Sequence, residues 1–478
     1  MKKYKSILFK LSAIVAFTVA LSSCMVGPNF QKVEVGIDSI DTFRFQGGAV
    51  DTSIVDMEWQ ELFNDSILVS LLDSALINNF DAQIAASRIQ ESRAYLGMTR
   101  ADMYPSFSYG GNANFGNTMG NFPTGQKANG SFSVNANVNW ELVFWGKYRR
   151  ATEAAKAELV ASEFGWNAIQ ISLISEVASA YYTLLDFRKR LEIAKRTHET
   201  RKESLRIISE RFDKGIVPEI DLNQAQIQEA IAAGAIPVYK RSIAYAENAL
   251  SILIGENPRE IITNTTIDSI AVPKSIPVGL PSQLLTRRPD VLAAEQMVVA
   301  QNARIGVAQA MRFPSISLTG LLGLASADLS AFNASDAIIG SAGAGIFGPI
   351  FQFGKNKRRV EVEKERTEQT KLNYKKTVAM AFRETENALI NLRSIEEELS
   401  FVEVQLEASK NASMLSKKRY DGGVTSYLEV LEADRSLFKI ELYRTELLQR
   451  RMSAYIELYK TLGGGWVPET AGEKLSQE

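Results

Sequence analysis

The stretch from Lys355 to Asp421, which contains neither glycine nor proline, restricts the fold of this chain more than any other feature. A comparable stretch between Gly146 and Gly215 lacks proline and is interrupted only by Gly165. Glycine and proline are the residues least suited to a helix interior, so each stretch predicts one continuous helix of about 100 Å. Helices in globular domains average about 11–12 residues, and this length therefore predicts an extended bundle or a coiled coil.

The chain also repeats itself. Residues 209–226 align with residues 417–434 at an offset of 208, which pairs Arg211 with Arg419 and Gly215 with Gly423. At an offset of 209, residues 94–108 align with residues 303–317. Separate segments that keep nearly the same offset over most of the chain indicate a tandem duplication.

Each repeat has the same predicted order of elements. A helix ends at Tyr104-Pro105 or Phe313-Pro314, because proline removes a backbone donor and disfavours helix at the residue before it. Two strands follow, separated by a polar loop, and in residues 131–142 apolar and polar side chains alternate without a break. A long helix, a glycine turn and a shorter returning helix complete the repeat. The predicted strands cover residues 105–116, 130–143, 314–324 and 337–351, and the predicted long helices cover 147–212, 219–254, 355–421 and 426–462.

Four such strands per chain are difficult to accommodate in a soluble protein. An open four-stranded sheet has two unpaired edges, and the helices cannot cover both of its faces. A membrane β-barrel covers the apolar face with lipid and has no edges, and the predicted strands have about the 9–11 residues that a span requires. The smallest barrels have about eight strands, so four strands predict an oligomer.

Aromatic residues near the predicted helix–strand junctions agree with a girdle at the membrane interface. Core positions in a soluble sandwich are the alternative interpretation of the same residues. The aromatic residues at these junctions are Tyr104, Trp140, Phe144, Trp145, Phe313, Phe351 and Phe353.

The N-terminus has the parts of an export signal. Lys2, Lys3 and Lys5 precede an apolar run that ends in Leu-Ser-Ser-Cys at Cys24. A cysteine directly after these residues resembles a bacterial lipobox, in which the thiol is acylated and the cysteine becomes the new N-terminus. An ordinary signal peptide followed by an incidental cysteine is the alternative. The predicted division is a signal peptide 1–23, a lipid-anchored linker 24–57, a first repeat 58–258, an equatorial inter-repeat linker 259–280, a second repeat 281–465 and a tail 466–478.

Composition argues against several classes of function. The net charge of −1 lacks the basic excess that is typical of nucleic-acid-binding proteins, so no nucleic-acid partner is expected. The chain has one histidine, His198, and one cysteine, which leaves no material for a metal, redox or nucleophile–base site. We therefore predict that the protein is not an enzyme and has no cofactor.

Three local signals have more than one interpretation. Gly343, Gly345 and Gly348 have the GxGxxG spacing, but Pro349 follows them where a dinucleotide site requires a helix, so small residues in a strand explain them better. His198 lies in a polar helix and is expected to be solvated. The basic runs 147–150 and 355–359 either contact lipid headgroups or are solvated helix starts.

Three segments resemble the TolC-like outer-membrane factor family, in its lipoprotein branch of the OprM/NodT type: CMVGPNF from Cys24, RRPDVLAAE from Arg287 and RYDGGVTSYLEVLEADRSL from Arg419. The resemblance implies a mainly α protein with a membrane β-barrel, in which a homotrimer forms a 12-stranded barrel and a long α-helical tunnel. The implied equatorial domain comes from residues near 190–200 and 256–280 and from the two terminal regions. It also implies an efflux duct in the cell outer membrane, lipid-anchored through Cys24, that passively conducts drugs, metals or other small solutes. The implied partners are a periplasmic adaptor and an inner-membrane RND pump.

The resemblance also assigns roles to individual residues. Leu428, Glu432 and Arg435 match the periplasmic gate, and their spacing places them on one helix face. Glu432 departs from the family pattern, which carries aspartate, and the alternative is an amphipathic helix with a solvated ion pair. The helix turns match sites of adaptor docking, with solvated turns as the alternative. The docking residues are Arg211, Asp213, Gly215, Arg419, Asp421 and Gly423, and the girdle residues are Tyr104, Trp140, Trp145, Phe313 and Phe353.

Three functional hypotheses follow. The first is the outer-membrane duct of an RND efflux system, with the outer-membrane component of a type I or ABC-driven secretion system as its close alternative. The second is a periplasmic coiled-coil lipoprotein without a pore, against which the alternating strands argue. An enzyme, the third class, has only the discounted glycine motif in its favour.

Overall fold

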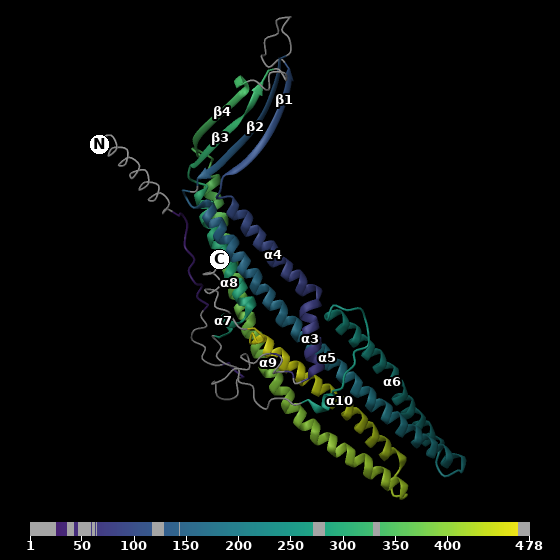
Figure 1. Cartoon of the computed structure of the whole chain (residues 1–478). Coiled ribbons are helices and arrows are strands. Elements are labelled where there is room, and N and C mark those ends of the chain that lie inside the picture. Colours follow the sequence, from purple (N-terminus) through teal and green to yellow (C-terminus); the bar gives the residue numbers. More distant parts are fainter. Residues whose placement is uncertain are drawn as a thin grey trace. The chain divides into compact units, whose positions relative to one another are not determined.

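The computed structural model describes residues 25–35, 43–45, 59, 63, 65–116, 129–142, 144–270, 283–327 and 335–466 (Figure 1). The chain divides into two compact units, which are described separately below. The strand unit comprises residues 1–34, 88–163 and 293–375, and the hairpin unit comprises residues 35–87, 164–292 and 376–478. The predicted signal peptide, Cys24, residues 271–280 of the predicted linker and the tail after residue 466 lie outside the described residues.

One antiparallel sheet forms the top of the strand unit in Figure 1, with the strand order β1-β2-β3-β4. Its strands are β1 (Ser106–Gly116), β2 (Asn129–Leu142), β3 (Ser315–Ser326) and β4 (Ile338–Phe347). Each sequence repeat contributes one β-hairpin to the sheet, and pairing between β2 and β3 joins the two β-hairpins. Within the described part of the chain β1 and β4 each have one partner strand, so the sheet has two open edges.

One face of this sheet is apolar across all four strands. Side chains alternate between faces along a strand, and the register places Val134 opposite Leu324 and Leu318 opposite Ala344. Several large side chains of this face are exposed, among them Phe107 at 77% and Leu322 at 66%. The opposite face of β2 carries polar residues, namely Ser131, Ser133, Asn135, Asn137, Asn139 and Glu141.

The fourth strand is shorter than the predicted stretch 337–351. It ends at Phe347, and Pro349 has no N–H group with which to continue the strand pairing. At Gly348 an added Cβ would lie 2.9 Å from Pro314, so the chain also approaches another backbone too closely for a side chain. Gly343 and Gly345 lie inside β4, as expected for small strand residues and unlike the helix start of a dinucleotide site.

Two long helical hairpins dominate the hairpin unit. One joins α5 (Lys147–Asp213) to α6 (Glu219–Leu253), and the other joins α9 (Lys355–Asp421) to α10 (Tyr427–Thr461). These bounds differ by at most one residue from the stretches predicted from the sequence. The other elements in the described part of the chain are α3 (Ser66–Asn78), α4 (Phe80–Ala101), α7 (Leu284–Arg287), α8 (Pro289–Ala310), and the 3₁₀ turns η2 (Ile267–Ser269) and η5 (Ser335–Ala337).

The main core of the hairpin unit lies between α3, α5, α6, α9 and α10. Its fully buried residues include Tyr181, Leu250 and Leu447, one from each of three helices. The Tyr181 hydroxyl donates to Asp65 at 2.7 Å, and Asp65 caps α3 by accepting from the N–H of Ile67 at 2.9 Å. Among the described helices, α5 contains one 18-residue stretch that is apolar enough to cross a membrane, but 56% of it is buried within the chain, as in the core helix of a soluble protein.

In the strand unit the first turns of α5 and α9 differ, although both begin with a basic run. Arg150 is 2% exposed and contacts residues 26–29, whereas Arg358, its equivalent in the second repeat, is 78% exposed. The expectation that the run 147–150 contacts headgroups or is solvated is therefore wrong for Arg150. Backbone carbonyls of the N-terminal segment take the place of water around its guanidinium.

Candidate functional site

The turns that join each long hairpin have the same backbone in both repeats. Gly215 and Gly423 each have a φ of +71°, which residues with a Cβ rarely adopt. Around Gly215, its N–H donates to the carbonyl of Phe212 at 2.8 Å and the N–H of Ile216 donates to that of Arg211 at 2.9 Å. The equivalent bonds in the second turn measure 3.0 and 2.9 Å, so both are Schellman motifs. No atom lies within 4 Å of an added Cβ at either glycine, so the backbone angle alone requires glycine.

Side chains connect the two turns to each other. The guanidinium of Arg211 lies 3.5 Å from the carboxylate of Asp421 and 5.1 Å from the ring centre of Tyr420. Arg419 instead pairs with Glu429 on its own hairpin at 3.0 Å. A small apolar cluster drawn from α5, α6 and α10 lies next to these contacts and consists of Ile208, Ala225, Tyr427, Val430 and Leu431.

The predicted gate residues lie in the first turns of α10. Leu428 is 54% exposed, and Glu432 and Arg435 form an ion pair of 2.9 Å within the chain. Arg435 also contacts Gln228 of α6, whose amide oxygen, oriented toward the guanidinium, accepts at 2.7 and 2.9 Å. Gln228 is 4% exposed, so Arg435 connects an exposed carboxylate to a buried amide on the neighbouring helix.

A second arginine, Arg201, lies next to the contact between Arg435 and Gln228, and it was not predicted from the sequence. Arg201 of α5 is 5% exposed, donates to the backbone carbonyl of Gln228 at 2.9 Å and lies 4.9 Å from the ring centre of Phe438. Burial lowers the pKa of Arg201, and the nearby carboxylate of Asp434 only partly offsets this effect. Asp434 itself is held by α9, through Lys417 at 3.1 Å and the hydroxyl of Ser413 at 2.5 Å.

The spacing of Arg201 is the signal that would have revealed it. Ala194, Arg201 and Ile208 lie seven residues apart, and all three are buried. A seven-residue spacing identifies one stripe of a packed helix, so an arginine within that stripe predicts a buried charge.

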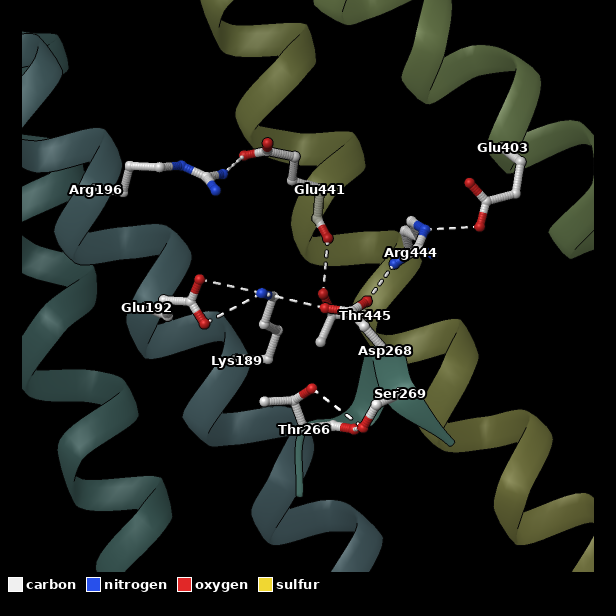
Figure 2. A network of polar contacts seen from close by, with 10 residues as sticks. All are labelled: Lys189, Glu192, Arg196, Thr266, Asp268, Ser269, Glu403, Glu441, Arg444 and Thr445. Atoms are coloured by element: carbon white, nitrogen blue, oxygen red, sulfur yellow. Dashed lines mark hydrogen bonds and ion pairs between the residues drawn. The ribbon is translucent and has the colours of Figure 1, made fainter. Parts of the chain in front are cut away.

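Farther along the same helices, Asp268 of η2 ties the inter-repeat segment to both hairpins (Figure 2). Its carboxylate lies 3.1 Å from the Nζ of Lys189 on α5 and 2.6 Å from the guanidinium of Arg444 on α10. Arg444 also binds Glu403 of α9 at 2.7 Å. Burial raises the pKa of Asp268, but hydrogen bonds from Arg444 and Lys189 outweigh burial and hold the pKa below its usual range.

The predicted girdle residues belong to the strand unit. Trp145 stacks on Phe313 with ring centres 4.6 Å apart, and its indole N–H donates to the carbonyl of Pro314 at 2.7 Å. The Trp140 indole donates to a backbone carbonyl at 2.9 Å. Tyr104 and Phe353 are 69% and 90% exposed. Partly exposed indoles whose N–H groups have partners, beside open aromatic rings, suit a boundary between lipid and water.

The described residues include no group of three or more histidine, cysteine or acidic side chains placed to hold a metal ion. His198 departs from the expected solvated position. Its Nε2 lies 2.8 Å from a carboxylate oxygen of Glu229, and its side chain is 22% exposed, because α6 packs against this part of α5. One carboxylate beside one imidazole is a helix-to-helix contact.

Comparison with known proteins decides the family. The sequence matches the outer membrane efflux protein family twice, over residues 71–256 and 280–464. The chain belongs to this family. The cation efflux system protein CusC of Escherichia coli is 32% identical over 455 residues, which cover 94% of this chain and 97% of that protein. The toluene efflux pump outer membrane protein TtgC of Pseudomonas putida is 30% identical over 98% of both chains.

Solved structures agree with the assignment to the outer membrane efflux protein family. The Campylobacter jejuni CmeC outer membrane channel has a TM-score of 0.86 and 26% identity, over 95% of this chain and 98% of that chain. The outer-membrane channel OprN has a TM-score of 0.84 and 28% identity, over 93% of this chain and 100% of that chain. The predicted TolC-like fold, with barrel strands and tunnel helices, is therefore confirmed, as is the predicted function in outer membrane efflux. All relatives named here are efflux or channel proteins.

Proposed function

We propose that three copies of the chain form one continuous duct across the outer membrane. The observation that carries this proposal is a sheet with an exposed apolar face and two open edges. Unpaired strand edges are not tolerated in lipid, so a membrane sheet must close into a barrel. The smallest closed barrels have about eight strands. Three copies of the four strands would close a 12-stranded barrel, with lipid against Phe107 and Leu322 and water against the asparagines of β2.

The first turns of α10 form the gate of this duct in our proposal. Three copies of Leu428 around an axis would form an apolar ring, and three Glu432–Arg435 pairs would form a charged ring beside it. Leu428 is 54% exposed, so its side chain is available to meet its two copies across the axis of a trimer.

The two turns dock a periplasmic adaptor in this proposal. Identical Schellman motifs in both repeats would present six equivalent turns per trimer. Each turn exposes one aliphatic residue directly after its glycine, Ile216 at 66% and Val424 at 71%. Arg211, Asp213, Arg419 and Asp421 surround these residues with charge, as in the polar rim of a protein interface.

The exported solutes enter from an inner-membrane RND pump through that adaptor. CusC is named for cations and TtgC for toluene, and both are about equally similar to this chain. Such different solutes share one kind of duct, so the pump selects the solute and the duct conducts it passively. Acylation of Cys24 attaches the chain to the outer-membrane lipid. A type I or ABC-driven secretion system is the alternative source of the solute.

Negative-stain electron microscopy of the detergent-purified protein tests this proposal. We expect hollow particles with three-fold symmetry and discrete conductance steps after reconstitution into planar bilayers. A monomer, a solid rod or another symmetry would overturn the trimeric duct. Deleting the RND pump or the ABC exporter of the host, one at a time, then identifies the energy source, since only the true partner's loss should mimic loss of the duct.

A further inference from the structure

The segment that directly follows Cys24 is bound in a specific site of the strand unit. Arg150 donates to the carbonyls of Val26 at 3.3 Å and Gly27 at 3.2 Å, and to the side-chain oxygen of Asn29 at 2.8 Å. The amide of Asn302 on α8 donates to the carbonyl of Pro28 at 3.1 Å. Two helices from different repeats thus bind four consecutive residues of the N-terminal segment.

Glycines shape the floor of this site. An added Cβ at Gly306 of α8 would lie 2.8 Å from the Cγ of Arg150 and 2.9 Å from the carbonyl oxygen of Val26. At Gly146 it would lie 2.6 Å from the Cγ of Met25, and at Gly27 it would lie 2.5 Å from the Cα of Gly306. These distances are shorter than those of real Cβ contacts, so the N-terminal segment can bind here only because these three positions are glycines.

The duplication supplies an internal comparison. Gly354 and Arg358 stand at the positions of Gly146 and Arg150 in the second repeat, and Gly97 stands at the position of Gly306 in the first. An added Cβ at Gly354 or at Gly97 has no atom within 4 Å, and the Arg358 side chain is 78% exposed. The same residue types therefore form a binding site only where the N-terminal segment lies, so the repeat alone does not create the site.

We propose that Gly146, Arg150 and Gly306 form a receptor site for the chain's own N-terminal segment, which sets the depth of the lipid anchor. The N–H of Val26 donates to the carbonyl of Trp145 at 3.3 Å, and Trp145 is a predicted girdle residue. Consecutive Cα atoms are about 3.8 Å apart, so an acylated Cys24 is attached within one residue of Met25. The anchor therefore starts at the level of the aromatic girdle, where lipid glycerol groups lie. This inference rests on the proposed acylation of Cys24.

Without the receptor site the anchor would have a long tether. The next residue that is buried in the described chain is Phe43, eighteen positions after Met25 and 3% exposed. An extended chain of that length spans about 60 Å, which would let the acyl chains enter the bilayer far from the barrel. Binding of residues 26–29 removes this freedom.

Hydrogen exchange of the full-length trimer in detergent tests the receptor site. Arg150→Met removes the guanidinium donors of the receptor site. Gly306→Ala places a methyl group where the N-terminal segment lies, while the helix itself gains about 1 kcal/mol, because alanine suits a helix interior better than glycine. We expect each change to accelerate exchange of the Val26 amide at least ten-fold. The repeat-equivalent controls, Arg358→Met and Gly97→Ala, should leave that exchange unchanged.

Two further outcomes separate this inference from the proposed function. Cys24→Ala, made with a cleavable signal peptide so that residues 1–23 are still removed, should leave the Val26 amide protected, because the receptor site and not the lipid holds the segment. Loss of protection in Cys24→Ala, or unchanged protection in both Arg150→Met and Gly306→Ala, would overturn the receptor site. Three-fold particles in electron microscopy report on the duct independently, so a failed receptor site and a failed duct give different results.

The depth of the anchor is measured in vesicles. A fluorophore on Gln31→Cys, an exposed position just after the bound residues 26–29, should report one narrow depth in the acylated chain when quenched by lipids brominated at defined depths. Arg150→Met should broaden that depth distribution, and Arg358→Met should not. The same distribution in both variants would show that the site does not set the depth.

Discussion

Replacing Arg435 by methionine should open the proposed gate, and replacing Glu432 by glutamine should hardly affect it. The two residues form one ion pair, but their surroundings differ. Glu432 has a side chain that is 63% exposed, and the pair links residues of the same helix. Arg435 additionally contacts Gln228, a buried residue of α6.

The expected magnitudes follow from this difference in burial. An exposed pair on one helix contributes about 0.2–0.5 kcal/mol, so Glu432→Gln should shift the gate equilibrium about two-fold at most. A hydrogen bond to a charged group contributes about 1.5–3 kcal/mol, and its loss leaves the Gln228 amide buried without this partner. A loss of about 2 kcal/mol corresponds to roughly 30-fold in an equilibrium constant. Arg435→Met should therefore shift the equilibrium between α10 packed against α6 and α10 separated from it by that factor in each protomer.

Single-channel recording in planar bilayers measures this balance as the fraction of time at high conductance. We expect Arg435→Met to raise that fraction strongly and Glu432→Gln to leave it close to the original. Adding Gln228→Leu to Arg435→Met should change little, because the two residues share one interaction. If Glu432→Gln opened the channel as much as Arg435→Met, the exposed ion pair would be the latch and the reasoning from burial would be refuted.

Three other changes test separate parts of the structure. Gly423→Ala forces a Cβ into a φ of +71° and should accelerate hydrogen exchange across the second turn several-fold, while Gly422→Ala, whose φ is not positive, should not. Val134→Lys on the lipid-facing side of β2 should destabilise the folded protein in vesicles by about 2–4 kcal/mol per chain in urea titration, while Asn135→Lys should fold normally and change ion selectivity. Burial raises the pKa of Asp186 to about 6 despite its ion pair with a neighbouring arginine, so the folded state binds its proton more tightly than the unfolded state. Thermal stability should therefore fall as the pH rises from about 4 to about 6 and then stay level, and Asp186→Asn should remove this fall.

The long helices and the strands were predictable because their signals are local. Glycine and proline end helices through the backbone of a few residues, and Gly215 and Gly423 occupy the left-handed positions that the sequence assigned to the turns. Alternation along β2 is likewise a property of one strand, and it correctly separates an exposed apolar face from a polar one. Such signals need no knowledge of the partner element.

The contacts of single side chains were not predictable in the same way. Arg150 and Arg358 follow similar residues in the sequence, yet one is 2% and the other 78% exposed. The difference arises from a segment more than a hundred residues earlier in the chain. His198 and Arg201 similarly face residues of α6 that no local pattern connects to them.

The duplication explains where symmetry is kept and where it is lost. The two turns have the same backbone bonds, and in the proposed trimer they would give an adaptor six equivalent docking turns. The residues of the proposed gate differ between the repeats, because Leu428, Glu432 and Arg435 have Ile220, Gln224 and Ile227 as their counterparts in the first repeat. Only one hairpin of each chain therefore carries the charged pair, and the proposed trimer would have three such pairs instead of six. In the proposed trimer, charge that is confined to one hairpin type would allow those three hairpins to detach while the other three continue to support the tube, and an identical pair in both repeats would not.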